Sequence, residues 1–380
     1  MTRTILLGVT SPASLGLMRG FPEYLADHGW DVHVVSSMGI VPERCSPHQQ
    51  FTHHTIPMAR NPHPVKDFVA LLRWWVLLMK LRPSVVDVGT PKAGLLGIVA
   101  AFLARVPHRV YLLRGLRYET STGVKRFILK SLEKITISLS HHVIAVSPSL
   151  RELVISEGLV RRNKVTVLGA GSSNGVDLNR FYPDPGHSTQ LRAHRWPADP
   201  NTPVFGFIGR IHPDKGVDLL YEAALLLHKD NLSFRLLIVG PNEHGVDYPK
   251  LFHQAGLPAT FTGGVTDPLP LLRQMDVLCL PTKREGFPNV VLEAAACAIP
   301  TLATRATGVV DAIIDGDTGV LCSRRDPVEY AALMRALMSD PRYRQKLGHQ
   351  ARERVLKLYA NEHVWERQHI FLTNLIHNNT

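Results

Sequence analysis

The segment PVFGFIGRIHPDKG, residues 203–216, decides how this chain folds. A buried strand ends near Gly209, a Pro-Asp turn follows, and a helix begins at about Val217, which is the strand–turn–helix unit of a parallel α/β sheet. Ligands of such sheets bind outside the carboxyl ends of the strands, where Arg210 and Lys215 stand. Two cations at this point suit a diphosphate. The alternative is that both are ordinary solvated side chains of a polar loop.

The same alternation of strands and helices runs along most of the chain. β-branched runs precede the segment at 4–10, 31–37, 85–89, 109–114, 142–147 and 164–168, and others follow it at 234–240, 259–262, 277–281, 300–304 and 320–322. This pattern predicts an α/β protein of two doubly wound Rossmann-like domains. Turn formers gather in AGSSNGVDLNRFYPDP, residues 170–185. We therefore expect an N-terminal domain over 1–170, a linker over 171–185 and a C-terminal domain over 186–360, with a C-terminal helix at about 361–380 that packs back on the first domain.

Composition excludes several classes of protein. The chain has 380 residues, of which 45% are hydrophobic and 20% charged, as in globular proteins. The longest uncharged apolar run, 93–104, is too short to span a bilayer, and the N-terminus lacks the pattern of a signal peptide, so we expect a cytoplasmic protein. Its 4 cysteines show no CxxC spacing, which disfavours zinc and disulfides. Neither half carries GxGxxG, which disfavours a hydride-transferring dinucleotide enzyme.

The net positive charge comes from the first half of the chain. Residues 1–180 hold 22 Lys and Arg against 11 Asp and Glu, whereas residues 181–380 hold 21 of each kind, so the net charge of +11 belongs to the N-terminal half. Such an excess indicates an anionic partner: nucleic acid, an acidic membrane surface or a phosphorylated substrate. No nucleic-acid-binding signature appears. We expect no nucleic-acid partner.

Two helices offer surfaces for such a partner. Residues 123–140 would place Arg126, Lys130 and Lys134 on one outer basic side, with apolar residues opposite. Residues 65–82 are apolar nearly all round, with Lys66, Arg73 and Lys80 in a stripe and Trp74-Trp75 at the centre. Interfacial membrane helices have this composition. The alternative is that both helices pack on the first sheet.

A second motif, EGFPNVVLE at residues 285–293, carries two carboxylates. Pro288 and Asn289 suit a helix start, with Asn289 able to cap it. Glu285 then lies in the loop before the helix and Glu293 about one turn inside it, so both would face one cleft. The helix N-terminus between them can bind an anion. The alternative is a surface loop and a solvated helix with two ordinary glutamates.

Together, the two motifs resemble those of the retaining glycosyltransferases of family 4, which have the GT-B fold of two Rossmann-like domains facing each other across a cleft. The matching elements are Gly209-Arg210…Lys215-Gly216 and Glu285…Glu293. FTGGV (261–265), ATGVVDAIIDGDTG (306–319) and the segment 170–185 are also similar to that family. Within it, GLRYET (115–120) and VSPSLRE (146–152) resemble enzymes that build capsular and exopolysaccharide chains.

The resemblance implies a role for each matching residue. Arg210 and Lys215 would hold the donor diphosphate, and Glu285 would bind hydroxyls of the donor sugar. Further contacts to the donor would come from the ribose-binding Glu293, from Val265 near the nucleobase, from the backbone around Gly286, Phe287, Pro288 and Asn289, and from Gly16, at a helix start in the first domain.

Arg114 departs from the family pattern. Many relatives carry His-Gly where this chain has Arg114-Gly115. A histidine exchanges a proton near neutral pH, and an arginine does not. Arg114 and Gly115 would then bind phosphate or the acceptor.

The implied function is transfer of a sugar from a nucleotide-sugar, UDP-linked by family tendency, to a lipid-linked or growing saccharide. We expect front-face substitution with retention, no cofactor and no metal, because Asp315-Gly316-Asp317 fits a turn better than a metal-binding DxD. The enzyme would lie peripherally on the inner face of the cell membrane, held to anionic lipid by its basic half. Alternatives are a nucleotide-sugar epimerase of GT-B fold and a catalytically silent module that binds a partner or a membrane.

Overall fold

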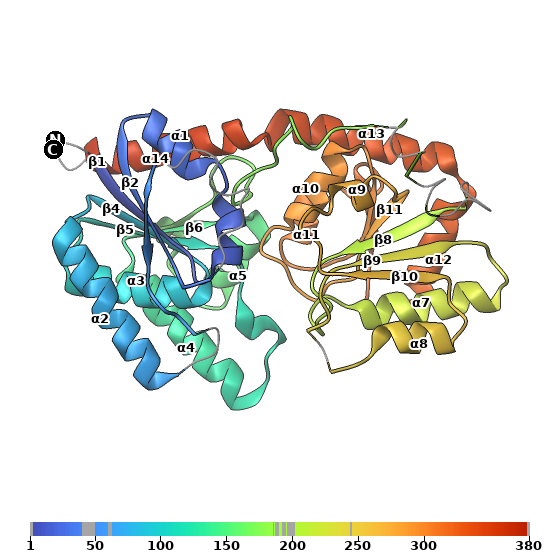
Figure 1. Ribbon diagram of the computed structural model, residues 1–380, viewed down its shortest axis with the longest axis horizontal. Coiled ribbons are helices and arrows are strands. Elements are labelled where there is room, and N and C mark those ends of the chain that lie inside the picture. Colours follow the sequence, from blue (N-terminus) through green and yellow to red (C-terminus); the bar gives the residue numbers. More distant parts are fainter. Residues whose placement is uncertain are drawn as a thin grey trace. The chain divides into compact units, whose positions relative to one another are not determined.

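The computed structural model describes residues 3–39, 50–59, 63–184, 186, 190–191, 195, 202–243 and 245–377. The chain divides into two compact units (Figure 1). The first runs as far as Asn174 and regains the chain from Asn361 onward, and the second spans Gly175–Ala360. Both are doubly wound α/β units, so the predicted fold class is confirmed.

The first unit is built on a sheet of seven parallel strands in the order β3-β2-β1-β4-β5-β6-β7. Six of these strands lie within a few residues of the predicted runs. The additional strand, THHT, escaped prediction because it has no apolar residue and forms the sheet edge. The strands are β1 (Arg3–Gly8), β2 (Trp30–Ser36), β3 (Thr52–Thr55), β4 (Val85–Gly89), β5 (His108–Leu113), β6 (His142–Ala145) and β7 (Val165–Thr166).

Helices cover both faces of the first sheet. In Figure 1, α2 (Pro64–Leu81), α3 (Pro91–Leu103) and α4 (Gly123–Leu139) lie on one face, and α1 (Phe21–Asp27) lies with α14 (Asn361–His377) on the other. Trp365 Nε1 of α14 donates to Asn174 Oδ1 at 2.8 Å and so ties the C-terminal helix to this unit. The other helices among the described residues of this unit are η1 (Pro12–Met18), η3 (Arg117–Thr120), α5 (Pro148–Ser156) and η4 (Arg162–Lys164).

The second unit has six parallel strands in the order β10-β9-β8-β11-β12-β13. The predicted strands are all present: β8 (Val204–Ile208), β9 (Arg235–Val239), β10 (Ala259–Gly263), β11 (Val277–Leu280), β12 (Thr301–Thr304) and β13 (Gly319–Cys322). The helices with described bounds are α7 (Val217–Lys229), α8 (Tyr248–Gln254), α9 (Leu269–Leu272), α10 (Asn289–Ala296), α11 (Val309–Ala312), α12 (Pro327–Ser339) and α13 (Pro341–Leu358).

Strand order locates the place in each sheet where a ligand would bind. The order of connection reverses between β1 and β4 in the first sheet and between β8 and β11 in the second. Doubly wound sheets bind ligands at such reversals, outside the carboxyl ends of the strands. In the second unit these ends lead directly into the two segments that carry Arg210, Lys215 and Glu285.

Helix α4 does not have the orientation that its sequence suggested. Lys130 Nζ lies 2.7 Å from Glu157 Oε2, and Arg126 Nη2 lies 3.3 Å from Glu157 Oε1, so these two cations turn toward the end of α5. Phe127 and Ile128 are instead 72% and 48% exposed. The prediction is therefore wrong for the apolar side, which is partly exposed, whereas Arg126 and Lys130 pair with Glu157 and still keep 40% and 35% of their side chains exposed.

Helix α2 leaves one apolar face in solvent. It buries Ala70, Trp74 and Leu78, so the two central tryptophans differ: Trp74 packs inside and Trp75 is 38% exposed. The apolar stripe of α2 consists of the exposed Val65, Phe68, Val69, Leu72, Trp75, Val76 and Met79. Among the described residues, no helix is long and apolar enough to cross a bilayer.

The cysteines that the structure describes are buried thiols. Cys279, Cys297 and Cys322 are free, and burial raises the pKa of Cys279 to about 12. Cys45 lies outside the described residues. A buried thiol with a raised pKa is a core side chain rather than a nucleophile.

Candidate functional site

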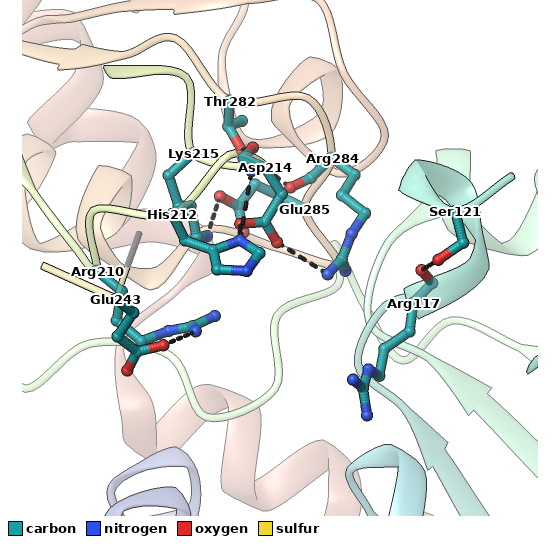
Figure 2. Close-up of polar contacts among 10 residues, drawn as sticks. All are labelled: Arg117, Ser121, Arg210, His212, Asp214, Lys215, Glu243, Thr282, Arg284 and Glu285. Atoms are coloured by element: carbon teal, nitrogen blue, oxygen red, sulfur yellow. Dashed lines mark hydrogen bonds and ion pairs between the residues drawn. The ribbon is translucent and has the colours of Figure 1, made fainter. Parts of the chain in front are cut away.

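An ion pair joins the two sequence motifs of the second unit. Lys215 Nζ lies 2.6 Å from Glu285 Oε1, and the two side chains are 21% and 14% exposed (Figure 2). Lys215 comes from the loop between β8 and α7, and Glu285 from the loop between β11 and α10. Both loops start at the reversal of strand order. The structure thus brings together two of the three predicted catalytic side chains at the edge where a ligand would bind.

Asp214 holds these two loops together. Its carboxylate accepts from Arg284 Nη2 at 2.9 Å and lies 2.5 Å from His212 Nδ1, as Figure 2 shows. Its backbone carbonyl accepts from Thr282 Oγ1 at 3.0 Å. Burial alone would raise the pKa of Asp214, but the hydrogen bond from His212 and the charges of Arg284 and Lys215 outweigh burial and hold that pKa below its ordinary value. Asp214 is therefore an ionised clamp beneath Lys215.

A glycine permits the close approach of the same two loops. Gly216 caps α7 with φ of 76°, and a Cβ there would lie 1.9 Å from the carbonyl oxygen of Pro281. Only glycine fits both the left-handed backbone and this contact. Gly216 thus fixes the backbone turn next to Lys215, the residue that we expect to bind the diphosphate.

Arg210 has a different partner from Lys215. Its Nη1 lies 2.6 Å from Glu243 Oε2, with the two side chains 38% and 30% exposed. Glu243 follows β9, the strand next to β8. Both cations at the carboxyl end of β8 thus pair with carboxylates. Glu243 was not predicted, because nothing in the motif indicates which acid faces Arg210.

The start of α10 differs from the prediction in one detail. The cap position is Pro288, and Asn289 is the first helical residue, so Asn289 does not cap the helix. The proline occupies the residue before the helix and offers no capping side chain. The first backbone N–H groups of α10 therefore have no side-chain cap, which is the arrangement that binds anions.

The backbone before α10 is fixed by packing. Phe287 is 7% exposed, and its ring centroid lies 5.3 Å from that of Tyr359. A Cβ on Gly308, which has φ of 75°, would lie 2.1 Å from the carbonyl oxygen of Gly286. These contacts hold the backbone of 286–289 in place beside the Glu285 side chain.

Two further predicted residues lie at the same end of the second unit. Val265 is 39% exposed in the loop after β10, the strand at the sheet edge beyond β9. Glu293 lies within α10, one turn after Asn289. Both positions fit contacts to the outer parts of a nucleotide.

The predicted residues of the first unit form a separate group. Gly16 lies inside the 3₁₀ helix η1 rather than at a helix start, because α1 begins only at Phe21. Arg114 Nη1 donates to the Leu17 carbonyl at 2.9 Å, so it holds η1. Burial lowers the pKa of Arg114 to about 10, and the nearby charge of Asp87 counteracts that effect. Arg114 thus acts on the loop that carries Gly16, and Gly115 follows it at φ of 128°.

The Asp315-Gly316-Asp317 segment is a turn, as the sequence predicted. The Gly316 N–H donates to the Gly319 carbonyl at 2.9 Å, Asp315 pairs with Arg305 at 2.6 Å, and Gln350 donates to Asp317 at 2.6 Å. Both carboxylates therefore have structural partners.

Comparisons with known proteins agree with this architecture. A family model for Glycosyltransferase Family 4 matches residues 21–180, and one for Glycosyl transferases group 1 matches residues 190–354. The capsular polysaccharide biosynthesis glycosyltransferase CapM of Staphylococcus aureus is 36% identical over 361 residues, which cover 94% of this chain and 93% of CapM. This chain belongs to the family 4 glycosyltransferases. The glycosyltransferase is of the GT-B, capsular polysaccharide type that its motifs indicated.

Other relatives of the glycosyltransferase are more distant. An N,N'-diacetylbacillosaminyl-diphospho-undecaprenol alpha-1,3-N-acetylgalactosaminyltransferase of Campylobacter jejuni is 29% identical over 79% of each chain. A UDP-Gal:alpha-D-GlcNAc-diphosphoundecaprenol alpha-1,3-galactosyltransferase of Escherichia coli is 29% identical over 66% of this chain and 65% of its own.

Solved structures share the fold of the glycosyltransferase at low identity. Anabaena HepE, crystallised with UDP and glucose, superimposes with a TM-score of 0.81 at 19% identity over 98% of this chain and 100% of its own. Sucrose-phosphate synthase of Thermosynechococcus elongatus superimposes with a TM-score of 0.83 at 20% identity over 99% of this chain and 100% of its own.

Proposed function

We propose that this glycosyltransferase moves a sugar from a UDP-sugar to a lipid-linked or growing saccharide, with retention of configuration at the anomeric carbon. The observation that supports this most is the contact between Lys215 and Glu285, because it joins the ammonium group that we assign to the diphosphate and the carboxylate that we assign to the donor sugar at one strand-order reversal. A nucleoside diphosphate sugar needs both within one site.

In the proposed reaction the groups that react are largely those of the donor. The bond between the anomeric carbon and the diphosphate oxygen breaks on the face where the acceptor oxygen attacks, and the acceptor proton passes to an oxygen of the departing diphosphate. Lys215, Arg210 and the N-terminus of α10 would stabilise the charge that grows on that diphosphate. The scheme uses neither a metal nor a cofactor, because Arg210 and Lys215 would supply the positive charge at the diphosphate.

The choice of substrates rests on the relatives. The Escherichia coli relative is named for UDP-galactose, and HepE was crystallised with UDP. Two relatives are named for diphospho-undecaprenol-linked acceptors. UDP as the nucleotide and a diphosphate-linked lipid as the acceptor carrier are therefore our proposal for this chain.

Membrane contact would come from the first unit. The apolar stripe of α2 is flanked by the exposed Lys66, Arg73 and Lys80, and the single acid of this helix, Asp67, is paired with Lys92 at 2.7 Å. Apolar side chains with cations beside them fit the surface of an anionic bilayer. We place the enzyme peripherally on the inner face of the cell membrane, with α2 rather than the cations of α4 as its contact.

A transfer assay tests the function. The purified enzyme would be incubated with UDP-sugars in EDTA, with and without a diphosphate-linked saccharide acceptor, and the products analysed by NMR. An acceptor-dependent product with the anomeric configuration of the donor is expected. A new epimer of the donor without acceptor would instead favour an epimerase, and an inverted product would contradict the front-face scheme.

A further inference from the structure

The 3₁₀ helix η1 lies where the first unit is expected to meet a ligand. It follows β1, whose carboxyl end stands at the reversal of strand order between β1 and β4. A Cβ built on Gly16 would have no atom of the described residues within 4 Å, and the φ of Gly16 is not positive. Neither packing nor backbone conformation therefore requires glycine at this position, and η1 leaves room for a ligand beside it.

A helix of this kind needs support from other segments. Stretches of 3₁₀ helix longer than about four residues are uncommon because their hydrogen-bond geometry is poor, and η1 has 7 residues. Pro12, Leu15 and Met18 are buried at a spacing of three, which places them on one side of the helix. The carbonyl groups at the end of a helix lack partners within it, so they need donors from elsewhere in the chain.

Two side chains supply these donors at the end of η1. Arg114 Nη1 donates to the Leu17 carbonyl at 2.9 Å. Asn174 Nδ2 donates to the Arg19 carbonyl at 2.9 Å, and Asn174 Oδ1 accepts from Trp365 Nε1 of α14 at 2.8 Å. Asn174 is 9% exposed, so both ends of a buried amide bind different segments. Such an amide fixes direction as well as distance, which an apolar side chain does not.

Trp365 also packs directly on the turn that follows η1. Gly20 has φ of 80°, and a Cβ there would lie 2.4 Å from the Trp365 ring. Only glycine fits both this backbone and this contact. Trp365 thus acts on the end of η1 in two ways, through its ring at Gly20 and through its N–H at Asn174.

Asn174 and Trp365 lie close in sequence to the two places where the chain passes between the units. Asn174 is the last residue of the first part of this unit, and α14 begins at Asn361, the first residue of its second part. Gln368 Nε2, one turn after Trp365, donates to the Ser173 carbonyl at 3.2 Å. The end of η1 is therefore held by the segment that leaves the unit and by the helix that returns to it.

We propose that Asn174 is a positioning residue for sugar transfer. Through its hydrogen bonds to the Arg19 carbonyl and to Trp365, it holds η1 and Gly16 at the carboxyl edge of the first sheet. This inference rests on the proposed function, because η1 affects catalysis only if a substrate binds beside it. It adds a residue of the predicted linker, to which the sequence motifs assign no role.

Hydrogen exchange and sugar transfer test this role together. Asn174→Ala removes both hydrogen bonds, and Trp365→Phe removes only the indole N–H and keeps a ring at Gly20. We expect amide exchange of residues 11–20 to be about fivefold faster or more in Asn174→Ala, because η1 loses a hydrogen bond. The kcat of transfer should fall ~10-fold or more, because small displacements of substrate-positioning segments are costly. Trp365→Phe should show both effects to a smaller degree.

Trp30→Phe is the matched control. Trp30 Nε1 donates to His369 Nδ1 of α14 at 3.2 Å, so this variant also removes an indole hydrogen bond between α14 and the first unit. Trp30 pairs with Arg3 at the start of β1, whereas η1 follows the end of that strand. Exchange of residues 11–20 and kcat should therefore keep their wild-type values in Trp30→Phe.

Two results would overturn the proposal. One is wild-type exchange of residues 11–20 in Asn174→Ala. The other is a fall in kcat that Trp30→Phe shares in proportion to its loss of Tm, which would mean that Asn174 only stabilises the unit. If Asn174→Ala does not fold, Trp365→Phe decides between the outcomes by the same measurements.

Failure of this inference differs from failure of the proposed function. Transfer by the wild-type enzyme with an unchanged kcat in Asn174→Ala and Trp365→Phe would refute the inference and leave the function standing. Faster exchange of η1 in the variants of an enzyme that transfers no sugar would refute the function and the catalytic role of Asn174, and would leave only its hold on η1.

Discussion

Lys215 Nζ lies 2.6 Å from Glu285 Oε1 although 70 residues separate them in the chain. The contact shows that the β8–α7 and β11–α10 loops form one site. It also shows that the ammonium group pairs with a carboxylate of the same site. In the proposed reaction the diphosphate takes over this cation and the donor sugar takes over the carboxylate, so the pair is a preorganised receptor for both parts of the donor.

Removal of the Lys215 cation should slow transfer without unfolding the chain. Loss of one group that stabilises transition-state charge typically costs ~10²–10³ in rate, and we expect a fall of that size for Lys215→Ala. Steady-state kinetics with saturating donor would measure it. Lys229→Ala, at the exposed end of α7, is the matched control. Near-full activity of Lys215→Ala would refute its assignment to the diphosphate.

Loss of the Asp214 clamp should destabilise the second unit in a pH-dependent way. Asp214→Asn removes a buried charge that Arg284 and His212 bind, which should lower the free energy of unfolding by ~1–3 kcal/mol at pH 7. The pKa of Asp214 lies below its ordinary 3.8 in the folded state, so its stabilisation is present above pH 3.8 and is lost as the pH falls through the folded value. Chemical denaturation at neutral and acid pH would measure the difference from wild type. A difference that stays constant into acid would contradict an ionised clamp.

Arg114 and Asp87 should be coupled in stability. Arg114→Ala removes the donor to the Leu17 carbonyl and leaves the carboxylate of Asp87, which is 5% exposed, without its nearby cation. Removal of one partner of a buried pair is more costly than removal of both. We therefore expect the Asp87→Asn/Arg114→Ala double variant to be more stable than Arg114→Ala alone, as thermal unfolding would reveal. Strictly additive losses would show that the two groups do not interact.

Membrane binding should depend on α2 and hardly on two of the cations of α4. Phe68→Ser/Val76→Ser removes exposed apolar side chains of α2 and should weaken co-sedimentation with vesicles that contain phosphatidylglycerol. Arg126→Gln/Lys130→Gln is the comparison, because both cations already pair with Glu157 and should contribute little. Equal loss in both double variants, or loss only in the α4 variant, would contradict this assignment.

Much of the fold followed from hydrophobic patterning. Buried parallel strands are apolar runs between helices, so twelve of the strands appeared in the sequence within a few residues of their observed bounds. The edge strand β3 was not predicted, because it has no apolar residue. Its His53 and His54 side chains hydrogen-bond to Ser36 and His33 of β2. A strand held by polar contacts carries no hydrophobic signal.

The sequence predicted only those features of the site that depend on neighbouring residues in the chain. The placement of Lys215 and Glu285 followed from their positions after strands, but their direct contact and the clamp at Asp214 depend on which strands are neighbours. The face of α4 was misassigned for a related reason. A helical pattern separates the Arg126 side from the Ile128 side, but it does not show that Glu157, the residue that ends α5, pairs with Arg126 while Ile128 stays exposed.

The central claim, that the second unit holds a nucleoside diphosphate between these two motifs, is tested most directly by calorimetric titration with UDP, GDP and ADP in EDTA. We predict binding of UDP in the micromolar range, weaker binding of the other two, and a marked loss of UDP affinity in Glu293→Gln but not in Glu353→Gln, an exposed control in α13. The absence of binding to all three nucleotides, or UDP binding that Glu293→Gln leaves unchanged, would contradict the account.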